Sequence, residues 1–304
     1  MTAAPVRVLV TGASGYVGQA VAAALREVLP CRTTSRSGAR STDHLPADLT
    51  RAEEAAAVLR WAEPSTVIHL AGGRAATTAA TYAANVSTTA SLLLAAAHEE
   101  LRPYVIVLGS AAEYGAGARI SERSPVAPGS PYARAKTAQV ALARRLAGRE
   151  RIPLTVVRPF AVVGPGMPAA TVLGDLRRRL LAARTPRPEL RCGRLDSVYD
   201  FVPVDFVAAV LRRLTIEPQP GLTLNVCSGT GLTVGSVALA MAGRLGLRPT
   251  FRPDPESAAT PRPPLAIGDP QLLADLFELR FDATPGTVAA AVLGRDVPAA
   301  QPAH

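Results

Sequence analysis

The chain has 304 residues, a formal net charge of +9 and only 4% aromatic residues. Its arginines are scattered and no basic stripe is interleaved with aromatic side chains, which argues against nucleic-acid binding. Three widely separated cysteines and four histidines without ligand spacing exclude a disulfide framework and predict no metal site. Neither a signal-peptide pattern nor an apolar run of about 18 residues is present, so we expect a cytoplasmic protein without a membrane partner.

The first half of the sequence alternates short runs rich in β-branched residues with longer segments rich in alanine and leucine. The short runs predict buried strands, and the longer segments, apolar at helical spacing, predict helices. One helix start is marked by a predicted capping box, Thr50 with Glu53. Strict alternation is typical of an α/β protein with a Rossmann-type, doubly wound parallel sheet. The predicted strands are Val6–Gly12, Cys31–Ser35, Thr66–Gly72, Tyr104–Ser110 and Pro153–Phe160.

Three glycines, Gly12, Gly15 and Gly18, lie in the segment TGASGYVG between the first predicted strand and the first predicted helix. Glycine there permits a tight turn and a close backbone approach, so that the helix N-terminus can face a pyrophosphate. The pattern is weak by itself, but it directly follows the first strand of an α/β alternation, which is the context that it requires. It predicts dinucleotide binding.

The end of the second predicted strand indicates which dinucleotide is bound. NAD-binding proteins commonly place a carboxylate there for the ribose 2′-hydroxyl, whereas arginine suits a 2′-phosphate. The segment CRTTSRSG has no carboxylate, and Ser35 and Arg36 could hydrogen-bond that phosphate. We therefore expect NADPH, with the alternative that Arg36 is a solvated loop charge. Downstream, Asp48 is a candidate acceptor for the adenine amino group.

The segment SPYARAK contains Lys136, the only lysine among the 33 Lys and Arg residues. Ser130 and Pro131 predict the N-cap and first turn of a helix that carries Tyr132 and Lys136 on one face. A compact ammonium there could lower the pKa of the phenol and bind the nicotinamide ribose, tasks for which a guanidinium is too large and too delocalised. The alternative is a chance surface pair. We expect a catalytic Tyr132–Lys136 pair.

The second half is less regular. It contains loops rich in glycine and proline, a helical segment at Thr171–Ala183, another from Gly235, and a proline-rich passage at Arg252–Pro264. Such material beside a Rossmann half predicts a smaller C-terminal substrate-binding lobe. We expect the NADP(H)-binding domain to comprise residues 1–160 with 200–227 returning to it, and the lobe to comprise residues 161–199 and 228–304.

In this combination the chain resembles the extended short-chain dehydrogenase/reductases, a family of nucleotide-sugar epimerases, dehydratases and reductases, and within it the GDP-4-keto-6-deoxymannose reductases. The matching segments are TGASGYVG, DLT, HLAG, GSAAEYG, PYARAK, RPFAVVGPG, DFVPVD and NVCSG. The resemblance implies a catalytic triad of Ser110, Tyr132 and Lys136, and suggests a homodimer. It also implies the following cofactor contacts: Gly12, Gly15, Tyr16, Val17, Gly18, Ser35, Arg36, Asp48, Leu49, Leu70, Ala71, Gly72, Tyr132, Lys136, Pro159 and Phe160.

The resemblance also bears on the reaction type. Dehydratases of the family carry a glutamate base where this chain has Ala112, and Glu113 should point the other way if the segment is extended. Epimerases retain NAD(H), whereas reductases exchange NADPH, so the strand-two pattern favours net reduction of a ketone. We expect Ser110 to bind the carbonyl oxygen, Tyr132 to act as general acid and Lys136 to stabilise the tyrosinate.

Two family positions that hold a substrate diphosphate differ here, with Ala161 in place of Asn and Tyr199 in place of Arg. Arg194 or one of the arginines at 177–179 could compensate. Otherwise the site takes a ketone without a diphosphate, such as a polycyclic natural product, against a roomier apolar wall. The departures favour the second substrate, and the alternatives are an NDP-4-keto-6-deoxyhexose reductase, a nucleotide-sugar epimerase and a non-catalytic NADP(H) sensor. The candidate substrate residues are Ala111, Ala112, Ala161, Met167, Arg194 and Tyr199.

Overall fold

The computed structural model describes residues 7–254 and 265–294, which divide into two compact units. Within this part of the chain, unit 1 comprises residues up to 115, 122–159 and 207–226, and unit 2 comprises residues 116–121, 160–206 and those from 227 onward. Most of the predicted proline-rich passage, residues 255–264, lies outside the described residues.

Unit 1 is built on a seven-stranded sheet in which every neighbouring pair is parallel. The strand order β11-β7-β5-β4-β1-β2-β3 changes direction at β1, so the predicted doubly wound parallel sheet is confirmed. The strands are β1 (Val8–Thr11), β2 (Cys31–Ser35), β3 (His44–Pro46), β4 (Thr66–His69), β5 (Tyr104–Leu108), β7 (Leu154–Pro159) and β11 (Thr223–Val226).

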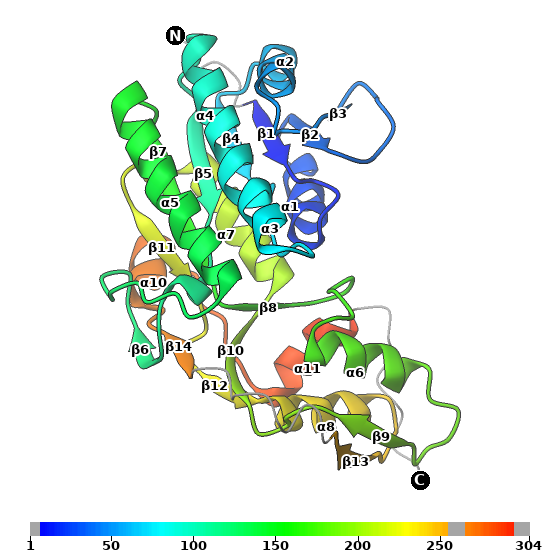
Figure 1. Cartoon of the computed structure of the whole chain (residues 1–304). Coiled ribbons are helices and arrows are strands. Elements are labelled where there is room, and N and C mark those ends of the chain that lie inside the picture. Colours follow the sequence, from blue (N-terminus) through cyan, green and yellow to red (C-terminus); the bar gives the residue numbers. More distant parts are fainter. Residues whose placement is uncertain (1–6, 255–264, 295–304) are drawn as a thin grey trace. The chain divides into compact units, whose positions relative to one another are not determined.

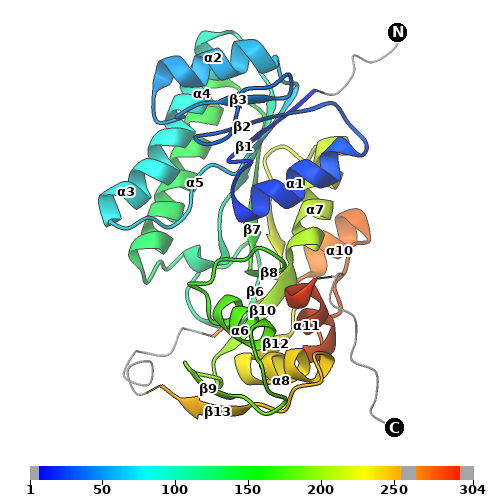
Figure 2. The same ribbon diagram turned by 90° about the vertical axis from the view of Figure 1, so that its right-hand side faces the viewer.

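Helices cover both faces of this sheet, with α2, α4 and α5 on one side and α1 and α7 on the other (Figures 1 and 2). Side chains alternate accordingly, since Leu9, Val67 and Val105 pack into the core shared with α2, α4 and α5. The carboxyl ends of β1, β4 and β5 therefore open onto one edge of the sheet. The helices are α1 (Tyr16–Arg26), α2 (Ala52–Ala62), α3 (Thr78–Tyr82), α4 (Thr88–His98), α5 (Pro131–Glu150) and α7 (Val204–Ile216, of which unit 1 contains the part from Val207).

In its described residues, unit 2 combines three small sheets with short helices. Its apolar core lies between α6, α8 and α11, against β8 and β10. The sheets pair β10 with β8 and β12, β9 with β13, and β6 with β14. The elements are β6 (Gly117–Ile120), β8 (Ala161–Val163), α6 (Val172–Leu181), β9 (Glu189–Cys192), β10 (Val198–Pro203), β12 (Gly231–Thr233), α8 (Val234–Arg244), β13 (Thr250–Pro253), β14 (Ala266–Gly268), α10 (Gln271–Phe277) and α11 (Pro285–Leu293).

A buried carboxylate, Asp200, joins three segments of unit 2. One of its oxygens accepts hydrogen bonds from the backbone and hydroxyl of Ser228, at 2.8 and 2.6 Å. The other accepts from the amides of Gly229 and Gly268, both at 3.0 Å. Asp200, the first aspartate of DFVPVD, thus acts together with the Ser-Gly of NVCSG. Their hydrogen bonds fix β10 against the loop after β11 and against β14.

The division differs from the expected boundaries at two places. Residues 116–121, which contain β6, belong to unit 2 and not to the segment 1–160. Strand β10 pairs with β8 and β12, so the chain returns to unit 1 at Val207 in α7 and not at residue 200. The assignment of one unit to the cofactor and the other to the substrate stays a prediction. In the ranges 7–254 and 265–294, no helix combines the length and apolar character needed to cross a membrane.

Candidate active site

The glycine turn after β1 has the geometry that a bound pyrophosphate requires. Gly12 has a φ of +68°, and a Cβ there would lie 2.6 Å from the backbone nitrogen of Ala71. A Cβ on Gly18 would overlap the carbonyl oxygen of Gly12. Helix α1 follows with Gly15 as an N-cap that makes no side-chain hydrogen bond, and its first turn has no acidic residue. The amides and the positive end of the helix dipole therefore suit an anion, so the turn fits the pyrophosphate of a dinucleotide.

The end of β2 presents Arg36 as an exposed cation. Ser35 is buried and its hydroxyl donates to the carbonyl of Ser37 at 2.6 Å. Asp48 accepts from the amide and hydroxyl of Thr50, and these hydrogen bonds, with a smaller contribution from Arg36, lower the pKa of its carboxyl. The Arg36 charge therefore acts on the Asp48 carboxylate, the two side chains from which we expect contacts with the adenosine part of the dinucleotide.

The predicted capping box of Thr50 with Glu53 is wrong. Helix α2 begins at Ala52, and its N-cap is Arg51, which makes no side-chain hydrogen bond. The Thr50 hydroxyl instead donates to Asp48 at 2.8 Å, so it is not available to cap the helix.

The other predicted cofactor residues are placed as follows. Tyr16 and Val17 lie half-buried in the first turn of α1, and the Leu49 side chain is buried. Leu70, Ala71 and Gly72 follow β4, where the Ala71 amide donates to the hydroxyl of Thr11 at 3.2 Å. Pro159 ends β7 in unit 1, and Phe160 begins the adjoining segment of unit 2.

Ser110 and Tyr132 meet at the carboxyl end of β5. Helix α5 begins as predicted, with the Ser130 hydroxyl accepting from the Ala133 amide at 3.1 Å and Pro131 in the first turn. Burial raises the pKa of the Tyr132 phenol, while a hydrogen bond with the Ser110 side chain and the charge of Arg74 act to lower it. A serine hydroxyl beside a half-buried tyrosine is an arrangement that can deliver a proton to a bound oxygen.

Lys136 is buried one helical turn further along α5. Its ammonium donates to the Leu108 carbonyl at 2.8 Å and to the Gln139 amide oxygen at 2.9 Å. Burial lowers the pKa of Lys136 to about 8, against the opposing effect of the Glu113 carboxylate. We expected this ammonium to lower the pKa of the phenol, and that is wrong here, because burial raises the phenol pKa and the opposing cation is Arg74.

The segment after Ser110 is not extended, which corrects the premise used for Glu113. Residues Ala111–Glu113 form a 3₁₀ turn capped by Ser110, with Ala111 buried and Ala112 exposed. Glu113 is fully buried, accepts from the Ser110 amide at 2.8 Å and pairs with Arg158 at 2.8 Å. Its carboxylate is thus committed to holding the Ser110 turn, and is not available as a base.

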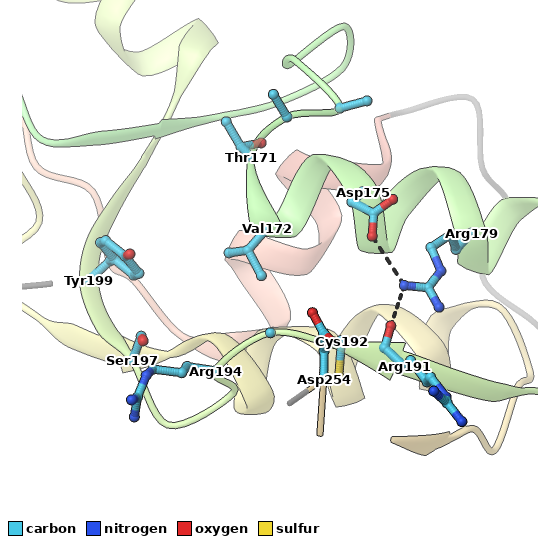
Figure 3. Close-up of a pocket in the computed structure, with 13 residues that line it drawn as sticks. Thr171, Val172, Asp175, Arg179, Arg191, Cys192, Arg194, Ser197, Tyr199 and Asp254 are labelled. Atoms are coloured by element: carbon cyan, nitrogen blue, oxygen red, sulfur yellow. Dashed lines mark hydrogen bonds and ion pairs between the residues drawn. The ribbon is translucent and has the colours of Figure 1, made fainter. Parts of the chain in front are cut away.

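Unit 2 contains a pocket of about 580 Å³ that receives two of the predicted substrate residues, Arg194 and Tyr199. Ala161 and Met167 instead pack against the apolar core of the unit. Figure 3 shows Arg179 bonded to both Asp175 and the Arg191 carbonyl on one wall of the pocket. The pocket is lined by Ala169, Ala170, Thr171, Val172, Asp175, Arg179, Arg191, Cys192, Gly193, Arg194, Ser197, Tyr199 and Asp254.

Two of the arginines proposed as replacement phosphate ligands do not line this pocket. Arg177 donates to the Val292 carbonyl at 2.9 Å, and Arg178 pairs with Asp175 on the exposed side of α6. Arg179 and Arg194 remain as the candidates on the pocket wall.

Several residues that lie near Tyr132 and Lys136 were not identified from the sequence. The guanidinium of Arg74 lies over the Tyr132 ring, and its loop position gives no periodic signal. Asn85 sits in a π-helical turn, Ala83–Ser87, and its side chain binds both backbone groups of Gly73. Gln139, the partner of Lys136, could have been found, because a spacing of three places it on the same helix face.

Comparison with known proteins agrees with this geometry. Residues 8–227 match the model of the NAD dependent epimerase/dehydratase family. The dTDP-6-deoxy-L-talose 4-dehydrogenase (NAD(P)(+)) of Kitasatospora kifunensis is 30% identical over 243 residues, covering 76% of each chain. The GDP-6-deoxy-D-mannose reductase of Pseudomonas aeruginosa is 30% identical over 241 residues, covering 73% of this chain and 75% of that protein. The structure of RMD from Pseudomonas aeruginosa complexed with NADPH has the same fold, with a TM-score of 0.80 at 24% identity, covering 95% of this chain and 96% of that one.

Proposed function

Because the chain belongs to the NAD-dependent epimerase/dehydratase family of extended short-chain dehydrogenase/reductases, we propose that it uses NADPH to reduce the 4-keto group of a nucleotide-linked 6-deoxysugar. Family membership makes the chain an NAD(P)-dependent oxidoreductase, as the sequence predicted. The direction of the reaction, the preference for NADPH and the substrate are the parts that we propose.

The observation that carries the proposal is the interaction of Ser110, which follows β5, with Tyr132 on α5, the helix that also carries the buried ammonium of Lys136. The Ser110 hydroxyl would hydrogen-bond the substrate carbonyl oxygen, and the Tyr132 phenol would give its proton to that oxygen. The Arg74 guanidinium, which lies over the Tyr132 ring, would stabilise the tyrosinate that remains, and the Lys136 ammonium would hydrogen-bond the nicotinamide ribose. Bound NADPH would supply the hydride, held by the glycine turn and by Arg36. Holding the carbonyl in attack geometry is the main contribution of the protein.

Reduction is favoured over dehydration by the residues after Ser110. A dehydratase needs a carboxylate base for the sugar ring, and the corresponding residue here is Ala112. The neighbouring Glu113 is buried in an ion pair with Arg158, so it cannot take that role without leaving the Arg158 charge unpaired. Arg36 supports NADPH, a reductant that is exchanged after each turnover, over a retained NAD.

A nucleotide-linked sugar is supported by the pocket of unit 2 and by the names of the relatives. Arg179, Arg191 and Arg194 stand on the pocket wall, where cations would favour a diphosphate. The two relatives are named for oxidation at position 4 of a dTDP-6-deoxysugar and for reduction to a GDP-6-deoxysugar. Both names concern the 6-deoxysugar class, although they differ in the nucleotide.

A ketone without a diphosphate is the second candidate. It is favoured by Tyr199, which lines the pocket and packs against Phe201 with ring centroids 5.5 Å apart. An aromatic wall at a position where the family resemblance implies arginine suits a flat apolar ligand.

NADPH oxidation by the purified chain separates the two candidates. We expect turnover with GDP- or dTDP-linked 4-keto-6-deoxyhexoses and none with hydrophobic polycyclic ketones. Arg194→Ala should raise the KM for the sugar nucleotide about tenfold or more, as loss of a charge-assisted phosphate contact implies. Arg187→Ala, which removes an exposed arginine outside the pocket, is the matched control. Turnover of the polycyclic ketones alone would instead select the second candidate.

A further inference from the structure

A continuous chain of buried hydrogen bonds runs from Lys136 to the strand that precedes the glycine turn. The Gln139 amide accepts from Lys136 at 2.9 Å and donates to the Thr89 hydroxyl at 2.9 Å. His69 contacts Thr89 at 2.9 Å through Nε2 and Thr11 at 2.9 Å through Nδ1. We call these five residues the lysine network. All of them lie in unit 1 and all are buried.

The direction of each hydrogen bond follows from counting protons. The single proton of the Thr89 hydroxyl goes to the Asn85 carbonyl at 2.7 Å, so its oxygen accepts from both Gln139 and His69. His69 therefore carries its proton on Nε2, and its Nδ1 accepts from Thr11. Burial, assisted by the Lys136 charge, lowers the pKa of His69 to about 3, which keeps the imidazole neutral. The network thus has one hydrogen-bond orientation, with the Gln139 carbonyl turned toward the lysine.

The Thr11 oxygen is then left to accept from the Ala71 amide at 3.2 Å. Thr11 is the last residue of β1 and directly precedes Gly12, whose φ and close contact with Ala71 define the glycine turn. The network therefore begins at the candidate lysine of the active site and ends at the residue from which the pyrophosphate turn departs.

From this continuity we propose that Gln139 is the positioning residue for Lys136, and that the lysine network fixes the ammonium relative to the glycine turn. The inference rests on the proposed function, in which Lys136 serves the bound dinucleotide. Of the three N–H groups of the ammonium, the Leu108 carbonyl and Gln139 engage two, which aims the third at a ligand.

A neutral partner has a consequence that a carboxylate would not have. Gln139 holds the ammonium without adding a negative charge, and the titratable groups that act on Lys136 from neighbouring elements are Glu113, after β5, and neutral His69, on β4. The pKa of Lys136 therefore stays at its lowered value of about 8. A carboxylate at position 139 would hold the proton to higher pH, because an opposite charge within about 4–6 Å commonly shifts a pKa by 1–3 units.

The single lysine makes a direct test possible. Protein labelled with carbon-13 at the lysine ε-carbon, carrying a lysine-free tag, gives one lysine side-chain signal by NMR, and its pH titration reports Lys136 without any turnover. We expect Gln139→Glu to raise the midpoint by at least about one pH unit. A midpoint that equals the wild-type value in a folded Gln139→Glu protein would overturn the proposal.

A second variant covers the case in which Gln139→Glu does not fold. Thr89→Val keeps Gln139 but removes the hydroxyl that orients its amide, and we expect NADPH affinity to fall about tenfold, measured by quenching of NADPH fluorescence. The matched control is Thr155→Val, which removes a hydroxyl that is equally buried and bonded to Tyr104 outside the network. Equal NADPH affinity in Thr89→Val and Thr155→Val would overturn the role of the network.

These outcomes are separable from failure of the proposed function. Wild-type protein that binds NADPH but does not reduce any ketone would contradict the proposed function, while the lysine titration would still report on Gln139. Normal ketone reduction together with a lysine titration midpoint that is the same in wild type and Gln139→Glu would contradict only the proposed role of the lysine network.

Discussion

The guanidinium carbon of Arg74 lies 5.3 Å from the centroid of the Tyr132 ring. A cation from the loop after β4 thus faces the candidate general acid, whereas the ammonium of Lys136 is held by Leu108 and Gln139. We therefore expect the two positive charges to have different tasks. Arg74 would act on the phenol, and Lys136 would act on the dinucleotide.

Replacing Arg74 by glutamine should therefore raise the pKa of Tyr132. An exposed cation–π contact is worth about 0.5–1 kcal/mol, which corresponds to about half a pH unit. The measurement is kcat for alcohol oxidation as a function of pH, because in that direction the tyrosinate accepts the proton. The part of this pH profile that depends on Tyr132 should move to higher pH by about half a unit. The control is Arg134→Gln, which removes a charge from α5 two residues after Tyr132 and on another face of the helix. This substitution should leave the pH profile unchanged.

Burial of Lys136 should make stability depend on pH in alkaline solution. The folded state releases the lysine proton at a pKa of about 8, whereas the unfolded lysine keeps it to its ordinary value of 10.5. Between these values the unfolded state binds more protons, so the contribution of Lys136 to stability rises with pH. Each pKa unit is worth about 1.4 kcal/mol, so the change amounts to a few kcal/mol.

Urea unfolding of wild type and Lys136→Met across this window measures the effect. The variant lacks the buried ammonium, so wild type should gain stability relative to it as the pH rises from 8 toward 10.5. A difference between the two proteins that stays constant with pH would mean that the lysine is not buried in its charged form.

Arg36 should decide the choice between NADPH and NADH. Loss of a charge-assisted hydrogen bond to the 2′-phosphate costs about 1.5–3 kcal/mol, so Arg36→Ala should raise the KM for NADPH at least tenfold and leave the KM for NADH nearly unchanged. Arg40, exposed in the same loop, supplies the control substitution Arg40→Ala. Equal effects of the two substitutions would make Arg36 an ordinary loop charge.

Asp200 should be required for the stability of unit 2. In Asp200→Asn the amide group would face at least one of the backbone amides that the carboxylate now receives. A buried donor left without an acceptor costs about 1–3 kcal/mol, and we expect a loss of that size in chemical unfolding. Asp282→Asn, at an exposed position of the same unit, should change stability by less than about 0.5 kcal/mol.

The parts of the fold that could be predicted from the sequence are those set by local pattern. Strand β2 was predicted with its observed bounds, and the start of α5 followed from Ser130 and Pro131, because capping and periodicity involve neighbouring residues. Strand β3 was missed, since the three residues His44–Pro46 include no β-branched side chain. The small sheets of unit 2 were missed because their strands are short and pair across long sequence separations.

The candidate site divides in the same way. The glycine turn and the Tyr132–Lys136 spacing are local, and the structure places them as the sequence implied. The Glu113–Arg158 pair joins residues 45 positions apart, and the stacking of Arg74 on Tyr132 depends on the path of a loop. Neither interaction is encoded in a short motif, and both changed the interpretation of the site. The ion pair with Arg158 occupies Glu113, and Arg74 supplies the cation at the Tyr132 phenol.

The most direct test of the proposed reaction is the fate of deuterium that replaces both hydrogens at C4 of the dihydronicotinamide of NADPH. Incubated with a GDP- or dTDP-linked 4-keto-6-deoxyhexose, the chain should give an alcohol with one deuterium at the former carbonyl carbon and an equal amount of NADP⁺. Tyr132→Phe should slow this transfer about 10²–10⁴-fold. A product that carries no deuterium, formed while NADPH is not consumed, would contradict net reduction and indicate an epimerase.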